Sequence, residues 1–205
     1  MVFERNGDRI TDISVSPFTD KDVCFSINTI IMSRALLERL VNGAVSSNGI
    51  SFEAILQKHV SSLNIRAYDV ESFAEPIDSL LSYYKISMEL INGSYSKLFL
   101  RERLIYTKVR DYMPAIYGIS SDVKNSLVAD GCIIKGKVEN CILFRGVRID
   151  EDAVVKNSII MQDSYISTGA KVNCAILDKG VAVKPGRELS GADTYPLYIG
   201  KAIVV

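Results

Sequence analysis

With 24 basic and 24 acidic side chains in 205 residues, the chain has no formal net charge, and its isoelectric point is near 6.6. This balance gives no electrostatic footprint for nucleic acid or for an anionic membrane surface. No window approaches the roughly 18 consecutive apolar residues of a membrane span, and the N-terminus resembles neither a secretory signal nor a transit peptide.

The first half of the chain mixes the patterns of strands and helices. A short apolar run at 25–32 predicts a buried strand. Ser33 is the expected N-cap of a helix that ends at Gly43, and a second helix is expected to begin at Ser51. The single histidine, His59, falls on the apolar stripe of that second helix, where we interpret it as a residue at the edge of the core.

Two further elements complete the first half. Residues 64–70 predict a strand, and residues 78–91 predict a helix capped by Asp78. Strands and helices therefore alternate, as in α/β domains. A connection follows, in which Pro114 and Gly118 interrupt regular structure.

From about residue 119 the helical periodicity disappears and a six-residue pattern recurs four times. The copies are VKNSLV, VENCIL, VKNSII and VNCAIL, and they begin 15, 17 and 17 residues apart. Three aligned columns hold Val123, Val138, Val155 and Val172; then Asn125, Asn140, Asn157 and Cys174; then Ser126, Cys141, Ser158 and Ala175. Two aliphatic columns follow, beginning at Leu127 and Val128.

Repeats of this length predict a parallel β-helix, in which coils stack and equivalent residues form ladders. Asparagine suits its corners because it tolerates left-handed backbone conformations. We expect the valine, small and aliphatic columns inside. A β-sandwich with accidental similarity is the alternative.

The four cysteines have neither a CxxC pair nor the density of a disulfide scaffold. We expect reduced thiols that pack as small apolar residues in a cytoplasmic protein. A zinc site is the alternative, although ligand spacing and nearby histidines are missing. The residues concerned are Cys24, Cys132, Cys141 and Cys174.

Left-handed β-helices of the hexapeptide type occur in acyltransferases, which use a histidine on the coil, and in sugar-nucleotide pyrophosphorylases. The only histidine here precedes the repeats, so an acyltransferase is the weaker hypothesis. The helix AEPIDSLLSYYKISMEL, the connection, the repeats and the ending YPLYIGKAIVV resemble the glucose-1-phosphate adenylyltransferase (ADP-glucose pyrophosphorylase) family. The resemblance spans essentially the whole chain and is densest in residues 105–205.

The resemblance implies a Rossmann-like nucleotidyltransferase domain followed by a left-handed β-helix. Residues 1–104 would then be the C-terminal part of that α/β domain, 105–118 a connection and 119–205 the β-helix. Members of the family use Mg²⁺ and ATP to make ADP-glucose from glucose 1-phosphate for bacterial glycogen biosynthesis. The chain matches only the C-terminal portion of the family's length.

Where the family carries catalytic residues, this chain departs from the pattern. The glycine-rich phosphate loop is missing, and Ser16 stands at the sugar-phosphate lysine. Asn28 replaces a glycine, Ile55 replaces an aspartate, and Pro76 replaces the aspartate that binds magnesium. A proline has no side-chain oxygen for a metal. Asp78, nearby, is assigned above to the helix cap.

We therefore expect no catalytic, metal-binding or substrate-binding residue and no cofactor in this chain. The pattern resembles the non-catalytic regulatory subunit that some bacteria add to this family. Its expected partner is a catalytic subunit, met through the β-helix in an oligomer. An active adenylyltransferase with unusual residues is the alternative.

A phosphorylated sugar effector is a further possible ligand. Basic residues gather in the connection and the second coil, and a solvated charged face is the alternative interpretation. The candidates are Arg103, Lys108, Arg145 and Arg148, with Arg101 and Arg110 beside them.

Overall fold

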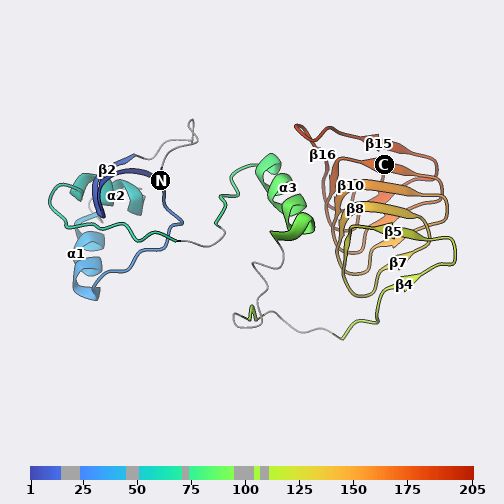
Figure 1. Cartoon of the computed structure of the whole chain (residues 1–205), viewed down its shortest axis with the longest axis horizontal. Coiled ribbons are helices and arrows are strands. Elements are labelled where there is room, and N and C mark those ends of the chain that lie inside the picture. The colour runs from blue at the N-terminus through green and yellow to red at the C-terminus, as the bar shows by residue number, and fades with distance from the viewer. Residues whose placement is uncertain (15–23, 45–50, 71–73, 95–103, 107–110) are drawn as a thin grey trace. The chain divides into compact units, whose positions relative to one another are not determined.

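The computed structural model describes residues 1–14, 24–44, 51–70, 74–94, 104–106 and 111–205. They fall into two compact units, Met1–Ala74 and Glu75–Val205, whose elements are drawn in Figure 1. The division differs from the boundary expected after residue 104. It falls earlier because a helix that precedes the connection packs on the repeat domain. No helix in the described ranges has the length and apolar character needed to span a membrane.

The first unit contains a small antiparallel sheet in the order β2-β1-β3, and two helices. Gly7, with φ at 64°, lies in the turn of the β1–β2 hairpin, where glycine adopts the left-handed conformation at little cost. Ile13, Leu40, Ile55 and Leu56 form the buried core of this unit. The elements are β1 (Val2–Asn6), β2 (Arg9–Ser14), β3 (Cys24–Phe25), α1 (Arg34–Ala44) and α2 (Phe52–His59).

Both strands predicted in the first half are wrong in extent. Of residues 25–32, only Phe25 lies in a strand, and Ile31 is 96% exposed. Residues 64–70 make only an isolated bridge from Arg66 to Arg9. An apolar run forms a strand only where a neighbouring backbone can pair with it, and among the described residues neither segment has such a partner along its length.

The predicted helix starts in this unit are confirmed. The Ser33 hydroxyl accepts a hydrogen bond from the Leu36 N–H at 3.3 Å, and the Ser51 hydroxyl accepts one from the Ala54 N–H at 3.3 Å. Each serine thereby satisfies a backbone donor that the first helical turn leaves free. α1 ends at Ala44, one residue beyond the predicted stop. His59 is exposed at the end of α2 rather than at the edge of the core.

The second unit is a parallel β-helix, as the repeats predict. One five-stranded sheet has the order β14-β11-β9-β7-β4, and the remaining strands form an eight-stranded sheet around β8 and β10. The strands stack coil upon coil in Figure 1. They are β4 (Ile116–Tyr117), β5 (Asp122–Lys124), β6 (Leu127–Val128), β7 (Ile133–Ile134), β8 (Lys137–Leu143), β9 (Arg148–Ile149), β10 (Val154–Ile160), β11 (Tyr165–Ile166), β12 (Lys171–Asn173), β13 (Ala175–Leu177), β14 (Ala182–Val183), β15 (Glu188–Ser190) and β16 (Leu197–Ile199).

The strand register reproduces the columns of the repeat. Val123 pairs with Val138, which pairs with Val155, which pairs with Val172. The series continues to Leu189, so a fifth coil extends the ladder beyond the four copies found in the sequence. The extra coil was missed because the residues after Leu189 do not repeat the motif.

The shorter first interval of the repeat comes from one tight corner. Ile134 pairs with Ile149, whereas Lys137 pairs with Val154. The corner between Ile134 and Lys137 is therefore two residues shorter than the equivalent corner of the next coil. A Cβ atom on Gly136 would lie 2.4 Å from the Ala153 carbonyl oxygen and 2.7 Å from that of Asp150. Only glycine permits this approach.

One aliphatic column points outward instead of inward, which corrects the sequence interpretation. Leu143 and Leu177 belong to the interior cluster, but Ile159 and Ile176 pack in a separate cluster with Tyr84 of helix α3 (Leu80–Glu89). Successive side chains of a strand face opposite sides of the sheet. Two adjacent aliphatic columns therefore cannot both line the interior, and α3 covers the outer one.

Candidate functional site

The corner that carries the asparagine column is built on left-handed backbone. Asn125, Asn140 and Asn157 have φ values of 42°, 52° and 45°, and Cys174 continues the column at 48°. This conformation is costly for most L-residues, and asparagine is among the few that adopt it readily. The chain therefore turns between two faces of the β-helix at the same point in four successive coils.

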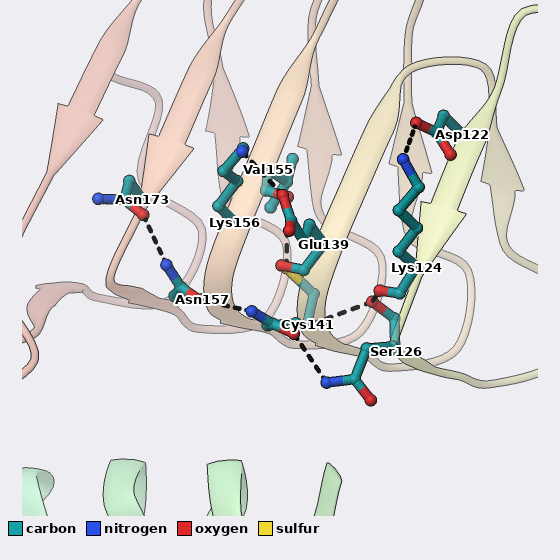
Figure 2. A network of polar contacts seen from close by, with 11 residues as sticks. Asp122, Lys124, Ser126, Glu139, Cys141, Val155, Lys156, Asn157 and Asn173 are labelled. Carbon is teal, nitrogen blue, oxygen red and sulfur yellow. Dashed lines mark hydrogen bonds and ion pairs between the residues drawn. The ribbon is translucent and has the colours of Figure 1, made fainter. Parts of the chain in front are cut away.

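The asparagine side chains at this corner form a continuous hydrogen-bonded line, part of which is seen in Figure 2. The Asn125 amide donates to the Asn140 amide oxygen at 2.7 Å, and Asn140 donates to Asn157 at 3.2 Å. Asn157 then donates to Asn173 at 3.1 Å. The last acceptor lies outside the aligned column. Asn173 accepts this hydrogen bond, although Cys174 is the residue that aligns with the three asparagines.

The small-residue column supports the same corner from inside. The Ser126 hydroxyl accepts from the Cys141 backbone N–H at 3.1 Å, and Ser158 accepts from the Ala175 N–H at 3.1 Å. The buried Cys141 thiol donates to the Glu139 carbonyl oxygen at 3.1 Å. Burial raises the pKa of this thiol to about 12. These residues tie consecutive coils together rather than forming a reactive group.

Helix α3 is fixed against this corner by Tyr84. Its phenol donates to the Asn157 carbonyl oxygen at 2.7 Å, and its side chain is only 3% exposed. Burial raises the pKa of the phenol, so the hydroxyl remains a donor. The helix begins at a capping box in which Ser79 accepts from the Ser82 N–H and the Ser82 hydroxyl accepts from the Ser79 N–H. Ser79, not the predicted Asp78, is thus the N-cap.

A hollow of about 350 Å³ lies between α3 and the asparagine corner. Asp193 reaches it from the segment between β15 and β16, and its carboxylate accepts from the Cys174 thiol at 3.2 Å. The end of α3 continues as the π-helical turn η1 (Leu90–Ser94), which contributes Ile91 and Asn92 to the lining. Sequence reasoning missed Tyr84, Asn173 and Asp193, because none of them lies in an aligned column.

Only two of the four predicted effector residues, Arg145 and Arg148, lie in the part of the chain that the structure describes. Arg103 and Lys108 lie outside the described residues, as do Arg101 and Arg110. The Arg145 guanidinium lies 5.9 Å from the centre of the Tyr112 ring, within the range of a cation–π contact. Arg148 is exposed on β9, in register between Ile133 and Tyr165.

The resemblance implies that catalytic residues are lost at four positions, and the structure describes three of them. Asn28 has φ at 58°, so it keeps the left-handed backbone that a glycine would adopt easily. Ile55 is buried in the core of the first unit, and Pro76 is half-buried at the start of the second. Ser16 lies outside the described residues. Within the described ranges, no group of three or more His, Cys, Asp or Glu side chains could hold a metal ion.

Comparison with known proteins identifies the repeat domain and its relatives. Residues 115–194 match the family model described as GlmU-like, C-terminal hexapeptide. Over 180 residues, 87% of the chain, it is 40% identical to the glycogen biosynthesis protein GlgD of Bacillus subtilis, of which it covers 52%. It is 50% identical over 70 residues to GlgD of Geobacillus stearothermophilus, covering 34% of the chain and 20% of that protein.

A third relative is the glucose-1-phosphate adenylyltransferase of Fervidobacterium nodosum, 31% identical over 133 residues, which covers 64% of the chain and 32% of that protein. The chain is thus a hexapeptide-repeat protein related to the glucose-1-phosphate adenylyltransferases. Within that group, the proteins that it is similar to include two D-type glycogen biosynthesis proteins. It spans about half the length of the Bacillus subtilis relative.

Proposed function

We propose that this chain acts as a regulatory subunit of glucose-1-phosphate adenylyltransferase in bacterial glycogen biosynthesis, or as part of one. It would assemble with a catalytic subunit in the cytoplasm and change that subunit's activity, without itself using Mg²⁺ or ATP. The observation that carries the proposal is the 40% identity to a glycogen biosynthesis protein over most of the chain. The proline at the aligned magnesium position agrees with a non-catalytic role.

The first coil offers a surface for such assembly. β4 is an edge strand of its sheet, and unpaired strand edges are sites of association. Exposed apolar side chains surround this edge: Met113 is 74% exposed, Ile116 is 52% exposed, and Ile119 is fully exposed. The opposite end differs, because Val204 forms a bridge with Ala182 and continues the pairing of that sheet. We propose the first coil as the oligomer contact.

A mixing experiment tests this function. The chain is combined with a glucose-1-phosphate adenylyltransferase from the same organism, complex formation is followed by light scattering, and pyrophosphate release from ATP and glucose 1-phosphate is measured. We expect a complex with altered turnover or altered response to sugar phosphates. Unchanged turnover and response in the mixture would contradict the regulatory role, and pyrophosphate release by the chain alone would favour an active enzyme.

A pair of variants tests the proposed contact. Ile119→Glu places a charge at the first coil and should weaken the complex at least about tenfold, since a charge in an apolar interface loses its hydration. Ile31→Glu is the matched control, because Ile31 is 96% exposed in the first unit. Equal affinities for both variants would place the contact elsewhere.

A further inference from the structure

Helix α3 and the residues around it belong to the β-helix rather than to the first unit. Residues from Glu75 onward form one compact unit with the coils. We infer that α3 is a coupling element, which passes changes at the first coil to the segment that begins at Glu75. The coupling itself is a property of this chain, and only its role in regulating a catalytic subunit rests on the proposed function.

The first part of the argument is how firmly α3 is held. Its inner face covers the outward isoleucine column, where Ile159 and Ile176 are completely buried. Tyr83 and Met88 pack against the same cluster. Burial of this kind costs free energy to reverse, in proportion to the apolar area exposed. A displacement of the coils therefore carries α3 with it.

The second part is the line of amides that runs from α3 to the first coil. Tyr84 holds the main chain of Asn157, whose side chain receives a hydrogen bond from Asn140, which receives one from Asn125. Asn140 and Asn157 each donate one of these bonds and accept another, so the geometry of one bond affects its neighbours. The Asn125 amide oxygen has no hydrogen-bond partner in the described ranges, so the line ends open at the first coil.

The third part is the direction of the line. Asn125, Asn140 and Asn157 each donate toward the next coil, so reversing one of them alone would set two donors or two acceptors face to face. Reversing all of the amides together would restore the pairing, so the line has a second self-consistent arrangement in principle, and two discrete arrangements of this kind can carry coupling between distant sites. A partner group that bonds the open end at Asn125 would favour one of them.

Hydrogen exchange on the chain alone tests the coupling. Asn125→Gly removes the first amide while tolerating the left-handed backbone at that position. We expect backbone exchange in α3 to rise at least about twofold, the lower end of such coupling effects. Lys124→Ala is the control, since its ion pair with Asp122 lies in the same coil but outside the line. Unchanged α3 exchange in Asn125→Gly would overturn the inference.

A double variant separates coupling from general loosening. In the Tyr84→Phe background, the further effect of Asn125→Gly on α3 exchange should be reduced, because the helix loses its bond to Asn157 while its apolar packing remains. Simple multiplication of the two effects would overturn the inference as well. Tyr198→Phe is the control for hydroxyl removal, since its bond to Asp178 lies on the surface.

Turnover of the mixed complex then shows what the coupling does. Tyr84→Phe should still bind the catalytic subunit but change its turnover at least about twofold less than the wild-type chain does. An undiminished effect would contradict a coupling role for α3. If the wild-type chain has no effect, the proposed function fails, while the exchange measurements still decide the inference.

Discussion

Tyr84 and Asn157 lie 73 residues apart in the sequence, yet the phenol of the first donates to the main-chain carbonyl of the second at 2.7 Å. The acceptor belongs to a residue with left-handed backbone, at a corner that the coils repeat. One hydrogen bond therefore joins helix α3, which lies outside the repeats, to the asparagine corner that recurs in the coils. This relationship can be tested by its effect on stability.

Tyr84→Phe should lower the free energy of unfolding of the second unit by about 1–2 kcal/mol, because the partly buried carbonyl of Asn157 loses its partner. Urea unfolding followed by circular dichroism measures the change. Tyr198→Phe removes an exposed hydroxyl and should cost less than about 0.5 kcal/mol. Equal losses would mean that the Tyr84 hydroxyl contributes no more than a surface group.

Substitutions at Asn140 should separate backbone strain from side-chain bonding. Asn140→Gly loses the amide, but glycine adopts a φ of 52° easily. Asn140→Ala loses the amide and also forces alanine into a left-handed conformation that is unfavourable for it. The alanine variant should be less stable than the glycine variant by about 1–2 kcal/mol. Thermal unfolding of the two proteins side by side gives the difference. If alanine were as stable as glycine, the corner would have changed conformation.

Gly136→Ala should destabilise the β-helix strongly. The new Cβ atom would lie 2.4 Å from a backbone carbonyl oxygen, so the coil must shift to admit it. We expect a loss of at least about 2 kcal/mol, within the range for overpacked sites. Gly43→Ala is the matched control, since a Cβ atom there meets nothing within 4 Å inside α1. It should be neutral or stabilising, and the reverse order would contradict the structure.

The inward and outward isoleucines should respond differently to truncation. Ile159→Ala and Ile160→Ala should each cost about 2–5 kcal/mol, as buried isoleucines do. Only Ile159→Ala removes a contact with α3, so it should raise exchange in α3 more than Ile160→Ala does. Equal exchange in the two variants would show that α3 does not depend on the outward column.

The buried thiols should resist modification in the folded chain. Burial raises the pKa of Cys132 and raises that of Cys141 to about 12 from an ordinary 9.0, so both remain protonated at pH 8. A thiol reagent should therefore react first with the half-buried Cys24 and reach Cys141 only on unfolding. Mass spectrometry of the labelled peptides checks the order, and prompt labelling of Cys141 would contradict its burial.

The same shift makes stability fall in alkali. Because the pKa of Cys141 is higher in the folded chain, its contribution is fully present below about pH 9 and is lost as pH rises toward 12. Cys141→Ser should weaken this dependence. An identical alkaline profile for the variant would assign the effect to other groups.

The repeats could be recognised in the sequence because each coil needs the same residue type at the same place. Valine at the interior position and asparagine at the left-handed corner are demanded by local geometry, so the periodicity appears directly in the residues. Ile159 was wrongly predicted to face the interior, because the two aliphatic columns look alike in sequence. Side chains alternate between the faces of a strand, so the column of Leu143 and Leu177 faces inward and that of Ile159 faces outward.

Features that depend on distant partners could not be predicted in this way. Tyr84 is one of two adjacent tyrosines in an amphipathic helix, and nothing local says that its hydroxyl meets Asn157. The strand predicted at 25–32 failed for a related reason, since an apolar sequence does not supply a pairing neighbour. Asp193 lies in a segment that interrupts the last coil, where the repeat gives no guidance.

Because the coils share one register, only insertions and deletions of certain lengths leave the strand pairing of the β-helix intact. Inserting or deleting 17 residues at a corner would leave every ladder from Val138 to Val172 aligned. A change by one residue within a strand would turn its interior side chains to solvent and its exposed charges inward. Natural length variation in this domain should therefore be quantised in whole coils, apart from additions confined to corners, such as the segment that carries Asp193.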